Sequence, residues 1–355
     1  MTRAVVGHDR VKEDLPQLKK ITNATFAIWD SQRHYTEASA WTQDGSFVME
    51  GPGWIEPKSK KPTHVLIGNH VGYTTWFAGI FGHHYDDHLP SIAYLRTQVP
   101  KDYKFILLDT KLGRAVLKFL DPDFYQRVVW VQEHDVVLVL GNLYVTRIHP
   151  TYPLMWGCNR PYDYLRAWIQ EKKPDVPTER NVVFYSRASS DTTHGRVLDK
   201  QLEQQILQRI RNAMVKYNRP EKDIVVFTGQ DENGKTLSVE EQFRIFRSAK
   251  TIIGPHGAGM LANLLWVDPR PMDCHNRVQA LEFIPGEEST QVQPLYHSMH
   301  MRWRNWPVDF NVLLFTKQST PKITRINLDD FDDALEGMWG GHGSGGSGGM
   351  STRTT

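Results

Sequence analysis

Residues 251–266 read TIIGPHGAGMLANLLW, which is an apolar run, a glycine-rich turn and a second apolar run. The first run predicts a buried strand over 251–253, and the second predicts a helix that begins at Ala258. Glycines let a backbone approach a ligand closely, and the first N–H groups of a helix favour a phosphate. His256, inside the turn, is a further donor for a phosphate oxygen. The segment predicts an anion site, and the alternative is a turn that only packs a strand against a helix.

The turn does not match the two common nucleotide-binding patterns. It fits neither GxGxxG, which is typical of dinucleotide binding, nor GxxxxGK[ST], which is typical of P-loops. The sequence therefore disfavours a nicotinamide enzyme and a P-loop NTPase.

Strands and helices alternate on both sides of this turn. The predicted strands cover 64–67, 105–108, 128–131, 136–140, 181–185, 223–228 and 251–253, and the predicted helices cover 76–96, 111–120, 198–217 and 239–248. Such alternation is typical of α/β domains with parallel sheets, which bind ligands at the carboxyl ends of their strands. The first sixty residues lack this pattern, and we expect an irregular cap there, with strand-like alternation only over 46–50.

The two α/β halves predict two Rossmann-like domains that face a central cleft. Residues 170–179 read QEKKPDVPTE, a polar, proline-containing stretch that is typical of a connector. We therefore expect a first domain over 1–168, a second over 169–325, a terminal helix over 326–339 and a flexible Gly/Ser tail over 340–355.

The composition excludes several classes of protein. Lys plus Arg number 42 and Asp plus Glu number 40, so the formal charge of +2 gives no reason to expect a nucleic-acid partner. Two cysteines, Cys158 and Cys274, are too few for a disulfide scaffold and too far apart for a CxxC site. No run approaches the ~18 apolar residues that would span a bilayer. We expect a soluble cytoplasmic protein, with room for a viral or microbial origin, or a Golgi-lumen protein if an N-terminal anchor was removed.

An ordered set of motifs resembles glycosyltransferase family 61. The matching segments are Gly82 to Pro90, Tyr185-Ser-Arg187 with Arg196, Ser238-Val-Glu-Glu-Gln242, Phe246-Arg-Ser-Ala249, Ile253 to Asn263 and Ala280-Leu-Glu282. They span roughly residues 65–285. One departure is Met260-Leu-Ala-Asn263, where the family usually has Leu-Thr-Asn, and it leaves the role of Asn263 open.

The resemblance implies an enzyme of the GT-B type, in which two Rossmann-like domains face a cleft. It implies an inverting glycosyltransferase that moves a sugar from a UDP-sugar onto a glycan or glycoprotein. We expect the transfer to be metal-independent, because no Asp-x-Asp motif lies near the predicted donor site, and Asp121-Pro-Asp123 begins a predicted turn in the other half. Xylose is the leading donor sugar, because the plant xylosyltransferases of the family are the nearest resemblance, and UDP-GlcNAc and UDP-arabinose stay open. The alternative of a different class is a non-catalytic module that binds a nucleotide sugar or a glycan.

The donor site is expected in the second half of the chain. The departing diphosphate gathers negative charge, which arginine forks and helix N-termini stabilise. The candidates for this role are Arg187, Arg196 and the turn Gly254, Pro255, His256, Gly257, Ala258 and Gly259. Glu282 ends an apolar strand, where, by analogy with dinucleotide folds, its carboxylate accepts the ribose hydroxyls.

The first half is expected to supply the base that inversion requires. His83 and Asp87 are four residues apart, so they share one face of a predicted helix. We expect one of them to be the base and the other to orient it. His84 and His88 have the same spacing and offer a rival metal site. Tyr85 stands where a zinc protease has its glutamate, so no metal site is predicted.

Overall fold

The computed structural model describes residues 18–31, 35–49, 61–74, 78, 81–146, 160–177, 181–187, 197–219, 223–268, 277–286, 308–316 and 322–340. The chain folds as two compact units that divide between Asp175 and Val176, and we call them the N-terminal unit and the C-terminal unit. Both units combine helices with parallel strands, so the predicted α/β class is confirmed.

The C-terminal unit is built on a five-stranded sheet in the order β11-β9-β12-β13-β14, in which every pair is parallel. The strands are β9 (Asn181–Tyr185), β11 (Ile224–Phe227), β12 (Ala249–Pro255), β13 (Val278–Gly286) and β14 (Val308–Thr316). The first three correspond to the predicted strands at 181–185, 223–228 and 251–253. A separate parallel pair joins β10 (Val197–Leu198) to β15 (Lys322–Ile323).

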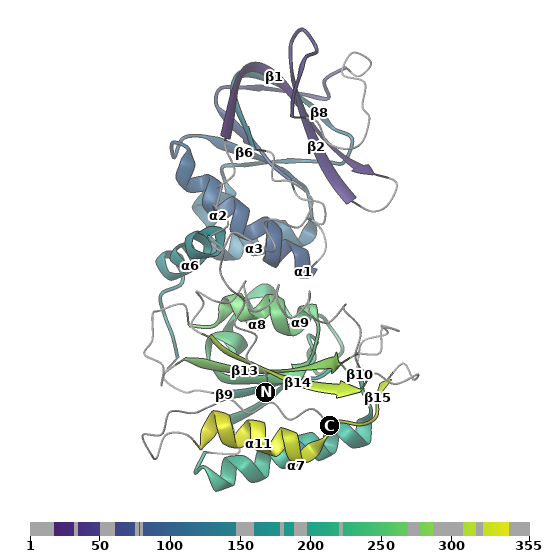
Figure 1. The fold of residues 1–355 in the computed structure, drawn as a ribbon. Helices are drawn as coiled ribbons and strands as arrows, with labels where there is room; N and C mark the ends of the chain where they lie inside the picture. Colours follow the sequence, from purple (N-terminus) through teal and green to yellow (C-terminus); the bar gives the residue numbers. More distant parts are fainter. Residues whose placement is uncertain are drawn as a thin grey trace, which may run out of the picture. The chain divides into compact units, whose positions relative to one another are not determined.

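Helices cover both faces of this sheet (Figure 1). One face carries α7 (Lys200–Lys216) and α11 (Leu328–Trp339), and the other carries α8 (Val239–Arg247) and α9 (Ala258–Leu261). The core under α7 and α11 is apolar and buried, and it includes Leu202, Ile206, Ile210, Met214, Phe331, Leu335, Phe184, Ile253 and Phe283. Burying each such side chain contributes about 1.5–3 kcal/mol. The predicted terminal helix is thus α11, which completes the core of the C-terminal unit.

The strand order places a topological switch point between β9 and β12. From β9 the chain passes through α7 to β11 on one side, and it then crosses back through α8 to β12 on the other side of β9. The connections after β9 and after β12 therefore leave toward opposite faces of the sheet. Open α/β sheets bind their ligands outside the carboxyl ends of the strands at such a point.

The helix predicted from Ala258 is only one turn long. α9 ends at Leu261, and a 3₁₀-helix, η3 (Ala262–Trp266), follows it. The Asn263 side chain gives the reason, because its Nδ2 donates to the carbonyl oxygen of Gly259 at 2.7 Å. That oxygen is the acceptor that the backbone N–H of Asn263 would use in an α-helix, so the side chain replaces the helical hydrogen bond.

The N-terminal unit contains a mixed sheet of eight strands in the order β3-β2-β1-β8-β5-β6-β7, with β4 also paired to β8. The strands are β1 (Leu18–Ser31), β2 (Tyr35–Thr42), β3 (Phe47–Met49), β4 (His64–Ile67), β5 (His70–Gly72), β6 (Lys104–Leu108), β7 (Val128–Val131) and β8 (Val136–Thr146). β4 to β8 pair in parallel with one another, whereas β1 pairs antiparallel with β8 and with β2. The four strands predicted in this half are β4, β6, β7 and the first part of β8.

The expected irregular cap over the first sixty residues is wrong, because β1, β2 and β3 form an antiparallel meander there. A bulge hides the alternation of β1, since its register against β8 shifts between Thr22 and Ala24. After the bulge every residue from Ala24 to Ile28 is buried, so no alternation of buried and exposed positions is visible there. Asn23 stands at the bulge with a φ of 51°.

Most helices of the N-terminal unit connect, along the chain, one parallel strand to the next. They are α1 (Phe81–His83), the π-helix η1 (His84–His88), α2 (Leu89–Gln98), α3 (Lys111–Leu120), α4 (Pro122–Tyr125) and α6 (Arg160–Lys172). The helix predicted over 111–120 is α3. The helix predicted over 76–96 corresponds to three consecutive segments, of which η1 has the uncommon π geometry.

The helix α6 belongs to the N-terminal unit along its whole length. Trp168, in its second half, is buried, and its Nε1 donates to Oδ2 of Asp121 at 2.9 Å. The guanidinium of Arg96 lies over the Trp168 ring at 4.5 Å. The units divide after α6, so the predicted boundary at residue 168 falls inside a helix that is anchored in the first unit. Of the predicted tail over 340–355, only Gly340 lies within the described residues.

Candidate functional site

Arg187 follows β9 and reaches the turn that follows β12. Its Nη1 donates to the carbonyl oxygen of His256 at 3.0 Å. Arg187 and His256 thus meet at the switch point, as the strand order requires. A guanidinium is a planar group of N–H donors, so this hydrogen bond orients it against the turn.

His256 is paired with Glu282 of the neighbouring strand. The Nδ1 of His256 lies 2.6 Å from Oε1 of Glu282. The Glu282 side chain is fully buried, whereas the His256 side chain is 12% exposed. A carboxylate only accepts, so Nδ1 is the donor and Nε2 lies at the other end of the ring. The buried carboxylate therefore fixes the orientation of a histidine that reaches the surface.

The glycines of the turn are required for packing against two side chains. A Cβ on Gly254 would lie 2.7 Å from Cβ and the carbonyl oxygen of Tyr185, and one on Gly259 would lie 2.6 Å from the Tyr185 hydroxyl oxygen. A Cβ on Gly257 would overlap Nη1 of Arg187. The packing alternative raised from the sequence is thus present in the structure, and it coexists with the site because Arg187 is one of the packed groups.

Several backbone N–H groups of the turn have partners inside the protein. The N–H of His256 donates to the carbonyl oxygen of Phe283 at 2.9 Å, and Pro255 has no N–H. The Tyr185 hydroxyl is hydrogen-bonded to the backbone of Gly259. Among the described residues, no backbone carbonyl oxygen accepts from the N–H groups of Gly257 and Ala258. These two N–H groups are therefore the candidates for an anion, and the binding role of the turn stays a prediction.

Burial controls the chemistry of Tyr185. Desolvation raises the pKa of its hydroxyl, while the nearby Arg187 charge and the Gly259 hydrogen bond act in the opposite direction. Tyr185 therefore stays neutral and keeps its hydroxyl proton at physiological pH. The next residue, Ser186, donates to the Glu203 carboxylate of α7 at 2.9 Å, and burial raises the pKa of Glu203.

The structure describes only part of the predicted base and donor residues. His83 ends α1 and Asp87 lies in η1, but the side chains of both are outside the description. Arg196 immediately precedes β10 and lies outside the described residues. These three assignments stay predictions.

The rival metal ligands of the sequence analysis are packed in the interior. His84 and His88 are buried, with ring centres 5.2 Å apart. His84 donates from Nδ1 to the carbonyl oxygen of Ala78 at 2.9 Å, and His88 stacks on Tyr73. Burial lowers the pKa of His84 to about 4, and it lowers the pKa of His88 well below 6.5. Both rings are therefore neutral parts of the core.

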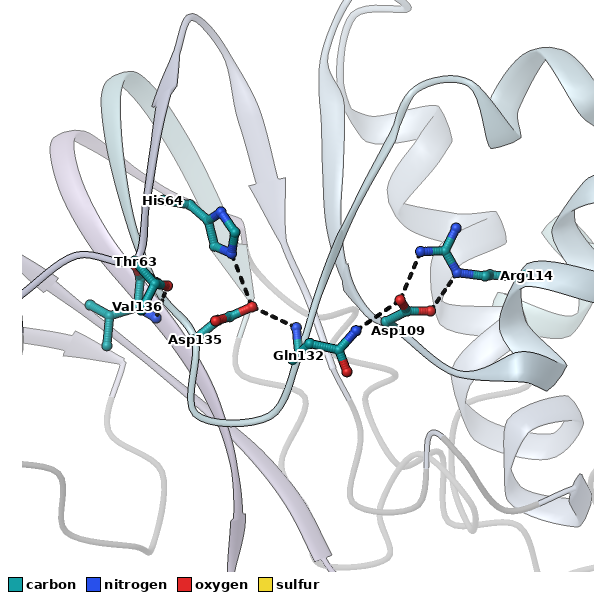
Figure 2. A network of polar contacts seen from close by, with 7 residues as sticks. All are labelled: Thr63, His64, Asp109, Arg114, Gln132, Asp135 and Val136. Carbon is teal, nitrogen blue, oxygen red and sulfur yellow. Dashed lines mark hydrogen bonds and ion pairs between the residues drawn. The ribbon is translucent and has the colours of Figure 1, made fainter.

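A polar network in the N-terminal unit holds the turn between β7 and β8 (Figure 2). Asp109 accepts two hydrogen bonds from Arg114 of α3, and Gln132 Nε2 donates to Asp109 Oδ2 at 2.9 Å. Asp135 accepts from the N–H of Gln132 at 2.7 Å and pairs with His64 Nε2 at 3.0 Å. The Arg114 hydrogen bond lowers the pKa of Asp109. Each of these side chains has at least one partner within the network, so we interpret it as structural.

Sequence reasoning did not assign a role to three residues that hold the turn, namely Tyr185, Gln242 and Asn263. Asn263 Nδ2 donates to Oε1 of Gln242 at 3.1 Å and to the Gly259 carbonyl oxygen. All three lie in the motifs that carry the family resemblance, but the motifs alone do not say what each side chain contacts. The glycine spacing was the available signal, because three glycines in six residues let another group approach the backbone closely.

An α/β unit with an arginine and an anchored histidine at its switch point has the features of a site for an anionic ligand. The family model described as Glycosyltransferase 61 matches residues 81–272, which is more than half of the chain. The chain belongs to this family, so the predicted resemblance and the coarse prediction of a glycosyltransferase with a sugar donor and an acceptor are confirmed. A comparison with curated proteins finds no match. In the described part of the chain, none of the helices has the length and apolarity needed to cross a membrane.

Proposed function

We propose that the chain is an inverting, metal-independent glycosyltransferase of the GT-B type that uses a UDP-sugar. The donor diphosphate binds at the switch point of the C-terminal unit, and the acceptor is a glycan or glycoprotein. UDP-xylose is the favoured donor, with UDP-GlcNAc and UDP-arabinose as alternatives.

The observation that carries the proposal is the convergence of Arg187, the paired His256 and the Gly257 and Ala258 N–H groups at the ends of β9 and β12. A leaving diphosphate develops negative charge as the sugar departs, and preorganised donors stabilise that charge. Arg187 supplies a guanidinium, whose planar fork of N–H donors matches phosphate oxygens in geometry. The two backbone N–H groups supply donors that need no reorganisation.

The His256 and Glu282 pair assigns a role to each residue. Glu282 holds the ring through Nδ1, which leaves Nε2 for the ligand. Nε2 accepts from a ribose hydroxyl when the ring is neutral, and it donates to a phosphate oxygen only when the ring carries a second proton. A direct ribose contact by Glu282, which the sequence predicts, would require this buried carboxylate to leave His256. We therefore assign Glu282 as a positioning residue that acts through His256.

The base comes from the segment that contains His83 and Asp87. Asp87 lies in the π-helix η1, and single π turns are frequent at functional sites. One of the two residues removes the proton of the acceptor hydroxyl, and the other orients it. Asp87→Asn and His83→Ala should abolish transfer while leaving UDP affinity unchanged. Arg196 is the second cation for the diphosphate.

A UDP-release assay tests the proposal with UDP-xylose, UDP-GlcNAc and UDP-arabinose and a panel of glycan acceptors. Turnover that continues in EDTA, with product of inverted anomeric configuration by NMR, is the expected result. If none of the three UDP-sugars is turned over, the enzyme assignment is contradicted. UDP binding without turnover would instead indicate the non-catalytic module.

A further inference from the structure

Two buried side-chain amides connect helix α8 to the glycine turn. Gln242 Nε2 donates to the carbonyl oxygen of Leu237 at 2.9 Å. Gln242 Oε1 accepts from Asn263 Nδ2 at 3.1 Å, and Asn263 Nδ2 also donates to the carbonyl oxygen of Gly259 at 2.7 Å. Gln242 is 6% exposed and Asn263 is 0% exposed. We call these two residues the amide relay. The hydrogen bond from Gln242 Nε2 to Leu237 directs Oε1 of Gln242 toward Asn263, and this oxygen in turn requires the Nδ2 side of the Asn263 amide to face it.

The first turn of α8 sets the position of Gln242. Ser238 Oγ accepts from the N–H of Glu241, and the Glu241 carboxylate accepts from the N–H of Ser238 at 2.7 Å. This capping box starts the helix, and Gln242 is the next residue. The Ser238-Val-Glu-Glu-Gln242 motif therefore has two physical roles. Its serine and second glutamate begin the helix, and the side chain of its glutamine extends from the helix to Asn263.

Gly259 is held through both of its backbone polar groups. The Tyr185 hydroxyl is hydrogen-bonded to the backbone of Gly259, and Asn263 Nδ2 donates to the carbonyl oxygen of Gly259. The carbonyl oxygen of Gly257 accepts from the N–H of Met260 at 3.1 Å. Because Gly257 and Ala258 directly precede Gly259, the direction of their N–H groups depends on how Gly259 is fixed.

We propose that Gln242 and Asn263 are positioning residues that aim the Gly257 and Ala258 N–H groups at the donor diphosphate. The inference deepens the proposed function and rests on it for the identity of the ligand. Removing the Gln242 amide takes away one acceptor of Asn263 Nδ2, so the Asn263 side chain can turn and release Gly259. A buried carbonyl without a donor is unfavourable, so the turn then populates conformations in which its N–H groups point elsewhere.

The experiment compares Gln242→Met and Asn263→Leu with Phe246→Leu in the full-length protein. Methionine and leucine approximate the shapes of the replaced side chains without their hydrogen bonds. Phe246 is buried in the same helix and packs on Phe227, so its variant destabilises α8 without touching the relay. Amide hydrogen exchange without ligand measures the exchange rates over residues 256–261, and calorimetry measures the Kd for UDP.

In both relay variants we expect hydrogen exchange over 256–261 to accelerate about tenfold and the Kd for UDP to rise about tenfold. Phe246→Leu should lower the Tm at least as much as the two relay variants do, and it should leave the UDP Kd unchanged. If Asn263→Leu does not fold, Gln242→Met decides alone.

Unchanged exchange over 256–261 in Gln242→Met would overturn the relay. Faster exchange with an unchanged UDP Kd would overturn its role in ligand positioning. If the wild-type protein itself does not bind UDP, the proposed function fails, and the exchange result still decides whether the relay holds the turn.

Discussion

Histidines in the two units differ in exposure and in the groups that they contact. In the C-terminal unit, His256 is partly exposed, and one end of its ring is held by the buried Glu282. In the N-terminal unit, His84 and His88 are both buried, and they contact a backbone carbonyl group, another ring and each other. An anchored ring that reaches the surface is available to a ligand, whereas a buried neutral ring contributes to packing. Histidine clusters in sequence therefore do not mark a site without the burial of each ring.

Removing the cation from the switch point should produce the largest effect. Arg187→Ala is expected to weaken UDP binding by about 1000-fold, or about 4 kcal/mol, because about two charge-assisted hydrogen bonds are lost. Calorimetry measures the Kd. Arg114→Ala is the matched control in the other unit, since Arg114 is held by Asp109 in the structural network and should not affect UDP. Equal affinity in wild type and Arg187→Ala would remove Arg187 from the site.

Acid should destabilise the N-terminal unit through its buried histidines. Burial lowers the pKa of His84 from 6.5 to about 4, so the unfolded chain binds a proton in this pH range that the folded chain does not. Stability is thus fully present above pH 6.5 and falls as the pH falls toward 4. The pKa difference corresponds to about 3 kcal/mol.

His84→Asn tests this expectation, because Asn Nδ2 can replace the Nδ1 donor to Ala78 without titrating. Urea unfolding at pH 7 and pH 4.5 should show a smaller acid loss in the variant, with His134→Asn, in an exposed turn, as the control. The same acid loss in His84→Asn and wild type would show that this ring does not control the transition.

A methyl group on the turn should cost stability where Tyr185 lies. Gly259→Ala puts a Cβ within 2.6–2.8 Å of the Tyr185 ring and hydroxyl, and we expect a loss of about 2 kcal/mol in the free energy of unfolding. Gly337→Ala in α11 is the control, because nothing lies within 4 Å of its Cβ, and a helical alanine should be neutral or stabilising. Combining Gly259→Ala with Tyr185→Leu should recover part of the loss, and no recovery would place the strain elsewhere.

Neutralising the histidine anchor should have the smallest effect. Glu282→Gln keeps an acceptor for His256 Nδ1 but removes the charge, so the ring is held less firmly. We expect the Kd for UDP to rise about tenfold. Asp309→Asn, a change on the edge strand β14, is the matched control for a removed carboxylate and should leave the Kd unchanged. A Glu282→Gln protein with wild-type affinity would contradict the positioning role.

The α/β class and the bounds of β7, β9 and α3 were predictable from the sequence, because apolar runs bounded by polar and turn residues mark such elements. Of the meander, the alternation over 46–50 marks only β3. β1 and β2 were not predictable, because the bulge at Asn23 in β1 breaks the alternation on which strand prediction relies. The length of α9 was also not predictable, since it depends on a side-chain hydrogen bond from Asn263.

The switch-point residues could be chosen from sequence, but their partners could not. The motifs single out Arg187, His256 and Glu282, and strand order alone brings the ends of β9 and β12 together. Only packing shows that Glu282 is buried against His256, and that Tyr185 uses the backbone of Gly259. For His83, Asp87 and Arg196 the sequence-based assignments stay predictions.

A crystal structure of the chain with UDP is the most direct test of where the diphosphate binds. We expect phosphate oxygens within hydrogen-bond distance of the Arg187 guanidinium and of the Gly257 and Ala258 N–H groups, with His256 still paired to Glu282. UDP bound away from the carboxyl ends of β9 and β12 would contradict it.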